Sequence, residues 1–288
     1  MSDLLKRALA EPGALVAPGI FDLISLRIAA RSGFKALYMT GYGTVASHLG
    51  LPDAGLASFR DMVTRVATMA DAAAEYGLPL IADGDTGYGG LLNVAHTIKG
   101  YEAAGAAAIQ LEDQNFPKKC GHTPGRTVIP AEEMVDKIKV AVDTRRDGNF
   151  LIIARTDART IHGLDEAIRR MALYSEAGAD ILFVESPESR DELVRIGRSF
   201  DKPLVANMVE GGRTPVLNAA ELGDLGFKIA LYPATGFLAV GAALTAAYSE
   251  MARRQGSAVD VPLHSFEDFN ELMGFKDVWE FERRHARG

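Results

Sequence analysis

The stretch "LPLIADGD" at residues 78–85 is a short apolar run that ends in two acidic residues. The apolar part has the length of one strand and does not alternate with polar residues, which is typical of a strand buried on both faces of a parallel sheet. Similar runs recur along the chain: "ALVAPG" (14–19), "KALYMTG" (35–41), "AAIQLED" (107–113), "FLIIARTD" (150–157), "DILFVES" (180–186), "PLVANM" (203–208) and "KIALYP" (228–233). The repetition predicts eight parallel strands.

Amphipathic segments separate these runs, as at 92–106 and 164–179, and a short helix is expected at 3–10. Eight strands that alternate with helices predict a (β/α)8 TIM barrel, an α/β fold. The main competitor is a doubly wound open sheet. Polar residues follow nearly every apolar run instead of gathering at one crevice, which favours the barrel.

The composition limits which classes of protein the chain can belong to. With 288 residues and 48% hydrophobic content, the chain has enough apolar surface for one barrel domain over 1–288. A formal net charge of -7 with scattered basic residues argues against a nucleic-acid partner. A single cysteine suits a reducing compartment, and the N-terminal residues lack the apolar run of a signal peptide or membrane span. We therefore expect a cytoplasmic protein that does not bind membranes.

The C-terminal segment, 257–288, is predicted to be helical and carries Trp279 and several phenylalanines. Apolar surface of this extent seldom stays exposed. From the residues alone, two packing surfaces remain open: the same barrel or a neighbouring subunit.

Acidic residues at the ends of two neighbouring runs indicate a metal site. Asp83 and Asp85 are two positions apart and so point to the same side of a strand, and Glu112 ends the next run. Hard oxygen ligands without histidine or thiolate suit Mg²⁺, with Mn²⁺ as the alternative. Each acid alone could instead cap a helix or pair with an arginine. The three together favour the metal.

Polar groups follow most of the other runs, and in a barrel they all converge on one mouth: Tyr38, Thr40, Gly41, Tyr42, Arg155, Glu185 and Asn207. The guanidinium of Arg155 suits a carboxylate ligand, although it could equally pair with one of the acids. The stretch "TGYG" (40–43) offers backbone N–H groups for an anionic oxygen, or is an ordinary loop.

The motif "KKCGH" (118–122) contains the single cysteine. The positive charges of Lys118, Lys119 and His122 predict a lowered pKa for the Cys120 thiol, which could then act as a nucleophile or as a general acid/base. The motif lies in a predicted loop that could close over a substrate. The competing interpretation is a small buried hydrophobic residue. One cysteine and one histidine are too few for a zinc site.

Taken together, "KKCGH", "DGDTGYGG", "LEDQ", "IARTDA", "FVES" and "ANMVEGGRTP" resemble the isocitrate lyase / phosphoenolpyruvate mutase superfamily, from about residue 18 to 279. The cysteine motif is similar to that of the carbon–carbon lyase branch. Within this branch, "EDQNFPKKCGHTPGRTVIPAEE" and "FNELMGFKDVWEFE" are most similar to the 2,3-dimethylmalate lyase and petal death protein group, and then to 2-methylisocitrate lyases.

The resemblance implies a barrel whose last helix is swapped between subunits of a homotetramer (a dimer of dimers) or a dimer. It implies that Mg²⁺ is held by these residues: Asp83, Asp85, Glu112 and Asp53. A 2-oxo acid would lie against Tyr38, Thr40, Gly41 and Tyr42, with Arg155 on its carboxylate. The rest of a small carboxylate substrate would meet Gly121, His122, Glu185 and Asn207.

The implied activity is cleavage of a 2-hydroxy dicarboxylate or tricarboxylate, such as a 2-alkylmalate or a 2-methylisocitrate-like acid, to a 2-oxo acid and a carboxylate. Cys120 would be the general acid/base and Lys118 would meet the charge of the departing fragment. The hydroxyl base stays open between Glu185, Tyr38 and another member of the shell. Two alternatives stay open, an oxaloacetate hydrolase and a Schiff-base aldolase using Lys118 or Lys119. Pro233, where such hydrolases tend to carry serine, argues against oxaloacetate hydrolysis.

Overall fold

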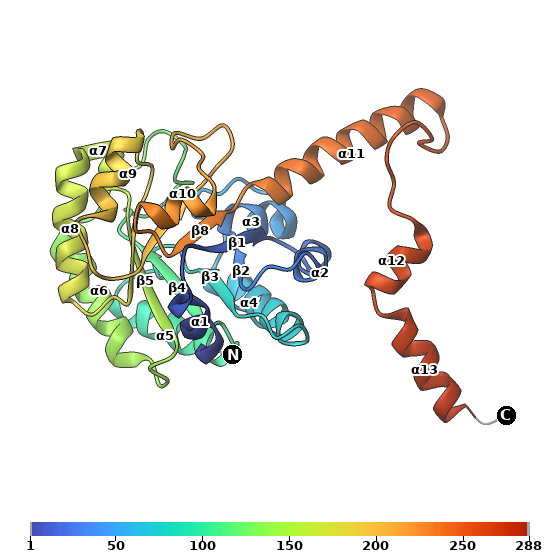
Figure 1. Ribbon diagram of the computed structural model, residues 1–288, viewed down its shortest axis with the longest axis horizontal. Helices are drawn as coiled ribbons and strands as arrows, with labels where there is room; N and C mark the ends of the chain where they lie inside the picture. Colours follow the sequence, from blue (N-terminus) through green and yellow to red (C-terminus); the bar gives the residue numbers. More distant parts are fainter. Residues whose placement is uncertain (1, 287–288) are drawn as a thin grey trace. The chain divides into compact units, whose positions relative to one another are not determined.

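A computed structural model describes residues 2–286, and the chain divides into two compact units, 1–236 and 237–288. In the first unit, the described residues form eight parallel strands that close into a barrel in chain order, with β8 paired to β1 (Figure 1). The strands are β1 (Leu15–Ile20), β2 (Leu37–Met39), β3 (Leu80–Asp83), β4 (Ala108–Glu112), β5 (Leu151–Thr156), β6 (Ile181–Val184), β7 (Leu204–Asn207) and β8 (Ile229–Tyr232). Seven of them lie within the predicted apolar runs, and β1 extends one residue past its run at 14–19, so the predicted barrel is confirmed.

Helices separate the strands and surround them (Figure 1). They are α1 (Ser2–Ala10), α2 (Leu23–Arg31), α3 (Gly41–Leu49), α4 (Phe59–Ala74), α5 (Leu91–Ala103), α6 (Ala131–Thr144), α7 (Ala158–His162), α8 (Leu164–Glu176), α9 (Arg190–Gly197) and α10 (Ala219–Asp224). Several begin with a side-chain cap, as where Ser58 accepts a hydrogen bond from Asp61 N at the start of α4.

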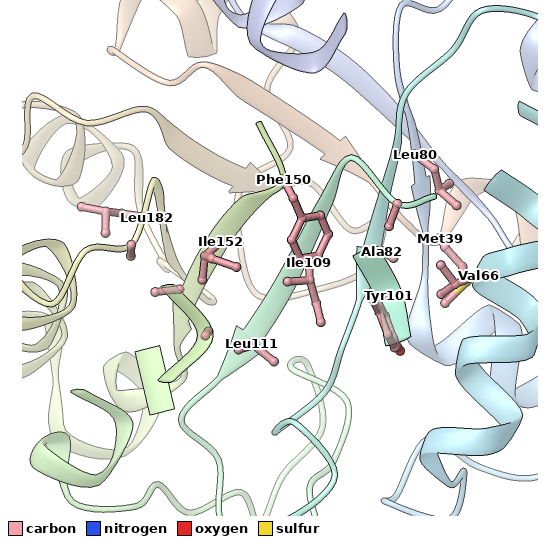
Figure 2. Close-up of a cluster of buried hydrophobic side chains, with 14 of the residues drawn as sticks. Met39, Val66, Leu80, Ala82, Tyr101, Ile109, Leu111, Phe150, Ile152 and Leu182 are labelled. Carbon is pink, nitrogen blue, oxygen red and sulfur yellow. The ribbon is translucent and has the colours of Figure 1, made fainter. Parts of the chain in front are cut away.

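The alternation of side chains along each strand divides the core into two layers. One set of strand residues packs outward against the helices, as in the cluster that includes Met39, Leu80 and Ile152 with Val66 of α4 and Tyr101 of α5 (Figure 2). The residues between them point into the barrel and form a separate interior cluster: Leu15, Ala17, Tyr38, Ile81, Ala108, Leu151, Ile153, Ile181, Phe183, Val205, Ile229 and Leu231. Both faces of every strand are therefore apolar, which explains the unbroken runs in the sequence.

Helix α1 covers the N-terminal end of the barrel. Leu5 is fully buried and belongs to the interior cluster, with Ala8 and Leu9 packed against it. Because this end is filled with apolar side chains, the polar chemistry is confined to the opposite end of the strands.

The second unit contains most of α11 (Thr235–Arg254), together with α12 (Phe266–Leu272) and α13 (Phe275–His285), so the predicted helical C-terminus is confirmed. Its large apolar side chains are mostly exposed, and neither α11 nor α13 buries a residue within the described chain. The rings of Phe275 and Trp279 lie 5.8 Å apart on α13. Among the described helices, none is long and apolar enough to cross a membrane.

Candidate active site

The interior positions at the C-terminal ends of the strands carry polar side chains in place of apolar ones. These residues are Asp83, Gln110, Glu112, Arg155, Glu185 and Asn207. Side chains alternate along a strand, and each of the six lies two residues beyond another interior residue, so each points into the barrel. Glu112 pairs in register with Arg155, and Asp83 with Gln110. All six residues are buried. The predicted convergence at one mouth of the barrel is therefore observed.

Arg155 is the central cation of this group. Its Nη1 lies 3.3 Å from Glu112 Oε2, and its Nη2 lies 3.3 Å from Glu185 Oε2. Two shorter hydrogen bonds, of 2.9 Å and 3.0 Å, join it to the carboxylate of Asp157. Burial opposes its charge, but Asp157, Glu112 and Glu185 outweigh burial and raise its pKa above the ordinary value. The sequence left pairing with acids open as an alternative to ligand binding by Arg155. These ion pairs are present in the structure, and they hold the guanidinium in the barrel mouth.

Gln110 connects two predicted site residues. The Tyr38 hydroxyl donates to Gln110 Oε1 at 2.9 Å, and Gln110 Nε2 donates to Asp83 Oδ1 at 3.3 Å. Burial, reinforced by the charge of Asp83, raises the pKa of Tyr38 well above its usual value. Sequence reasoning overlooked Gln110, although its position two residues before Glu112 on the same strand could have identified it.

Lys118 lies between two of the predicted metal ligands. Its Nζ is 2.5 Å from Asp53 Oδ1 and also forms an ion pair with Asp85, and its side chain is only 4% exposed. Burial raises the pKa of Asp85 to about 7, with Asp83 and Asp53 adding to the shift and Lys118 opposing it. Burial likewise raises the pKa of Asp83 and of Glu112. Lys118, helped at Asp83 and Glu112 by Arg155, opposes these shifts without cancelling them.

These acids fit a divalent cation in their chemistry. The buried Glu112 Oε1 has no hydrogen-bond partner, and the carboxylates repel one another where they lack a cation. Within the described residues, no three His, Cys, Asp or Glu side chains converge closely enough to enclose a metal by themselves. Mg²⁺ does not need such a cage, since it commonly binds through one or two carboxylates and retains several waters. The ligand roles of Asp53, Asp83, Asp85 and Glu112 stay predictions.

The "TGYG" stretch is the beginning of a helix, not a loop. Thr40 is the N-cap of α3, and Gly41, Tyr42 and Gly43 form its first turn. A Cβ atom on Gly41 would overlap Asp83 Oδ2, so only glycine allows this backbone to approach the acid. The N–H groups of this first turn suit an anionic oxygen, as any helix N-terminus does.

The "KKCGH" motif lies in the loop between β4 and α6, on the same side of the barrel as the polar strand ends. The loop is tied down at several points. Cys120 N donates to Asp53 O at 3.1 Å, and the side chain of Gln114 bonds both the N–H (3.0 Å) and the carbonyl (2.8 Å) of Lys119. Sequence reasoning did not identify Gln114, which holds the loop without any charge of its own.

The predicted lowering of the Cys120 pKa is wrong. Burial raises the pKa of the thiol above its ordinary value; a hydrogen bond from the His122 backbone and the charge of Arg155 oppose the shift, and Asp53 and Glu185 add to it. The two lysines do not supply the expected positive charge, since Lys118 is paired with Asp53 and Asp85 and Lys119 points to Gly125 O. Cys120 is therefore a protonated thiol near neutral pH.

His122, Glu185 and Asn207 form a third group of predicted site residues. His122 Nδ1 accepts from Arg213 N at 3.3 Å, which leaves Nε2 as the protonated nitrogen, 3.3 Å from Glu185 Oε1. Asn207 Nδ2 donates to Glu185 Oε2 at 3.1 Å. Burial alone would raise the pKa of Glu185, but Arg155 and His122 outweigh it and lower the pKa far below the usual range. Glu185 is thus a fixed anion.

Gly121 lies where the loop meets this group. A Cβ atom there would overlap Arg155 Nη2 and lie 2.8 Å from Glu185 Oε2. The Gly121 carbonyl accepts from Ser186 Oγ at 3.0 Å. The backbone beside Cys120 therefore rests directly on the two charged residues, which joins the loop to the buried strand ends in one site. Tyr42, another predicted binding residue, is 39% exposed.

Comparison with known proteins agrees with this arrangement. The phosphoenolpyruvate phosphomutase family model matches residues 5–252. The chain is 47% identical to 2,3-dimethylmalate lyase of Eubacterium barkeri (99% of this chain, 98% of the relative). It is 40% identical to the petal death protein of Dianthus caryophyllus (97% and 88%) and 39% identical to 2-methylisocitrate lyase of Aeropyrum pernix (98% and 89%).

Solved structures match over nearly the whole chain. An oxaloacetate acetylhydrolase bound to 3,3-difluorooxalacetate gives a TM-score of 0.94 at 34% identity (100% of this chain, 97% of the other). A 2,3-dimethylmalate lyase, described as a PEP mutase/isocitrate lyase superfamily member, gives 0.92 at 34% (99% and 95%). A phosphonopyruvate hydrolase with oxalate and Mg²⁺ gives 0.88 at 29% (99% and 99%). The chain is therefore an enzyme that belongs to the phosphoenolpyruvate phosphomutase family, within the PEP mutase/isocitrate lyase superfamily.

Proposed function

We propose that this enzyme is a Mg²⁺-dependent carbon–carbon lyase that cleaves a 2-hydroxy dicarboxylate or tricarboxylate to a 2-oxo acid and a second carboxylate. The substrate class is a 2-alkylmalate such as 2,3-dimethylmalate, or a 2-methylisocitrate-like acid. The observation that carries the proposal is the cysteine loop, whose backbone is bonded to Asp53 and rests on Arg155 and Glu185, at a buried site that combines this arginine with a cluster of carboxylates. The 47% identity to a 2,3-dimethylmalate lyase supports the substrate class.

The substrate carboxylates would be bound by groups that already face the barrel mouth. Arg155 would bind the carboxylate of the 2-oxo acid half in place of its longer contacts with Glu112 and Glu185, while Asp157 keeps the other edge of the guanidinium. The first turn of α3 and the Tyr38 hydroxyl would be the other donors. His122 and Asn207 both contact Glu185 and suit the remaining carboxylate and the hydroxyl. Glu185, Tyr38 or another member of the shell would remove the hydroxyl proton; the lowered pKa of Glu185 and the raised pKa of Tyr38 count against these two as the base.

The carboxylates of Asp83, Asp85, Glu112 and Asp53 would hold Mg²⁺, either directly or through water. When bound, the ion would lower the pKa of the substrate hydroxyl and stabilise negative charge on its oxygens. The raised pKa of Asp85 and the unpartnered Glu112 oxygen support a cation at this place.

The chain's own residues would control the proton on carbon. Cleavage leaves the bonding electrons on a fragment whose carboxylate becomes an enediolate, which carries two negative charges. Lys118 and the neighbouring donors would stabilise that charge. The Cys120 thiol would then donate its proton to the carbon, and the resulting thiolate would remove it again in the reverse reaction.

A panel of 2-substituted malates and 2-methylisocitrate, with Mg²⁺ present, tests the proposal by 2-oxo acid release. We expect turnover with at least one member of the panel, loss of turnover in EDTA, and recovery on adding Mg²⁺ or Mn²⁺. Absence of 2-oxo acid from every compound, or turnover that persists in EDTA, would contradict the proposal.

A second candidate is oxaloacetate hydrolysis in the same site, which the match to an oxaloacetate acetylhydrolase favours. Detection of oxalate and acetate from oxaloacetate would promote this candidate over the lyase. A Schiff-base aldolase is less well supported. The amine of such an enzyme must lose its proton, whereas Asp85 and Asp53 outweigh burial and raise the pKa of Lys118 well above its ordinary value. Trapping of a 2-oxo acid on the chain by borohydride would reverse this ranking.

Assembly forms part of the same proposal. The exposed apolar side chains of α11 and α13 suit packing of the C-terminal segment (257–288) against a partner subunit, in a homotetramer in which one helix is exchanged. The free thiol suits the reducing cytoplasm as the compartment.

A further inference from the structure

Arg126 is a buried cation on the same loop as Lys118, Cys120 and His122. Its side chain is 2% exposed. Nη1 donates to Oδ1 of Asp157, Nη2 donates to Thr160 Oγ1 at 3.0 Å, and Nε donates to Thr123 O at 3.2 Å. The guanidinium therefore attaches the cysteine loop to the end of β5 and to α7.

The acid that receives Arg126 is the one that orients Arg155. Asp157 is fully buried, its Oδ2 accepts from Arg155 Nε at 2.9 Å, and its Oδ1 accepts from Arg155 Nη2 at 3.0 Å. Asp157 Oδ1 thus receives hydrogen bonds from both arginines, one on the cysteine loop and one in the barrel mouth.

Sharing one carboxylate between two arginines has an electrostatic consequence. Arg155 also pairs with Glu112 and Glu185, so the two arginines and three carboxylates, when ionised, carry a net charge of -1 (two positive and three negative groups), which loss of Arg126 would make -2. Buried charges are weakly screened, so loss of Arg126 would leave the full charge of Asp157 acting on Arg155. Arg126 also holds Asp157 in place, and Asp157 already receives Nε and Nη2 of Arg155, so loss of Arg126 would free this carboxylate, and the guanidinium bound to it, to move.

We propose that Arg126 is a positioning residue that couples the placement of the Cys120 loop to carboxylate binding by Arg155. With the loop in place, Arg126 shares the charge of Asp157, and Arg155 keeps both its direction and its attraction for the substrate. The thiol and the carboxylate-binding arginine are then presented together. This inference rests on the proposed function, in which Arg155 binds the carboxylate of the 2-oxo acid half.

The test compares Arg126→Ala and Arg126→Lys with a matched control, Arg159→Ala. Arg159 is a partly buried arginine on α7 that pairs with Glu188 and Glu192 instead of Asp157. The measurements are the Kd of oxalate in the presence of Mg²⁺, kcat and KM for the substrate found in the malate panel, and recovery of each on adding guanidinium chloride. Thermal unfolding identifies any variant that has not folded.

For Arg126→Ala we expect the oxalate Kd and the KM to rise by about 10-fold to 100-fold, the range of one lost charge-assisted hydrogen bond, with a smaller fall in kcat. Guanidinium should restore both constants, while ammonium at the same ionic strength should not. Arg126→Lys, which keeps the charge but not the fork, should fall between the wild type and Arg126→Ala, and Arg159→Ala should match the wild type.

Two results would overturn the coupling and leave the lyase proposal standing. One is a folded Arg126→Ala variant that binds oxalate like the wild type. The other is an Arg126→Lys variant that binds oxalate no better than Arg126→Ala, together with no rescue by guanidinium. A wild-type enzyme that neither binds oxalate nor releases a 2-oxo acid would instead overturn the proposed function, and this inference with it.

Discussion

At the scale of single residues, the site depends on close approach between the loop backbone and charged side chains. Gly121 separates Cys120 from His122, and its α-carbon faces Arg155 and Glu185 without room for a methyl group. Crowding, and not backbone conformation, requires glycine at this position, because the φ angle of Gly121 is not among the positive values. The site therefore constrains this residue even though it carries no functional group.

Replacing Gly121 with alanine should reduce kcat/KM by about 10-fold or more, because an added methyl group in a filled space costs about 1–3 kcal/mol and here displaces Arg155 or Glu185. Gly148→Ala is the control, since a Cβ atom at Gly148 meets open space. Steady-state kinetics with both variants checks the prediction. Equal activity of the two would show that the loop moves aside without consequence.

Replacing Cys120 with serine should lower turnover by at least ~100-fold, the scale of a lost general acid/base. Serine retains the size of the side chain, so the binding of oxalate with Mg²⁺ should hardly change. Isothermal titration calorimetry and turnover assays on the same preparation separate these effects. Near-normal turnover would exclude the thiol as the proton donor.

At the scale of elements, α8 supports the cysteine loop from behind. Its Arg170 donates to the buried Asp113 carboxylate at 3.0 Å and to the Ile129 carbonyl at 2.8 Å, at the two ends of the loop. Glu166, one turn earlier on α8, bonds both Arg169 and Arg170. Hydrogen bonding by Arg169 is the main reason that the pKa of Glu166 falls to about 2.

This shift predicts how the stability depends on pH. The folded pKa of Glu166 lies below its ordinary value of 4.5, so its ionised form stabilises the fold above that pH, and the contribution fades as the pH falls toward about 2. We expect Glu166→Gln to lower the free energy of unfolding by about 1 kcal/mol near neutral pH, the upper range for partly exposed pairs, and to match the wild type in strong acid.

Urea unfolding at several pH values measures this difference. Glu176→Gln, at the C-terminal end of the same helix, is the control, and removal of a negative charge there should be slightly stabilising because of the helix dipole. A Glu166→Gln effect that stayed constant down to the acid limit would show that its ion pairs contribute nothing.

At the scale of the whole molecule, the two units differ in how they bury apolar side chains. The barrel unit has two apolar layers, whereas the described part of 237–288 leaves large side chains such as Tyr248, Phe266 and Trp279 exposed. A stable protein covers surface of this kind, and we propose that a partner subunit does so.

The variant with Phe275→Ala and Trp279→Ala should therefore have a smaller molar mass in solution than the wild type. These rings lie 5.8 Å apart and are 43% and 47% exposed, so they form one apolar face of α13. Light scattering coupled to size-exclusion chromatography measures the mass. Glu280→Gln, an exposed polar position on the same helix, should leave it unchanged. An unaltered mass in the double variant would place the subunit contact elsewhere.

Much of the fold and site was predictable because both follow from the strand period. Runs such as 78–85 and 150–157 are apolar on both faces, which specifies parallel strands under helices, and their last residues must point into the barrel. For the same reason Asp83, Glu112, Arg155, Glu185 and Asn207 could be named in advance as neighbours. The place of each residue at the end of an apolar run predicts that these side chains are neighbours.

The sequence by itself determined the barrel, the chemical groups at its mouth and the presence of one thiol beside them. Only the tertiary structure decided how those groups pair: Lys118 with Asp53 and Asp85, and Arg126 with Asp157. It also reversed the expected pKa shift of Cys120. The physical reason is that charge acts through space and depends on burial, so a lysine two residues away in the sequence has little influence on the thiol once its ammonium is paired elsewhere.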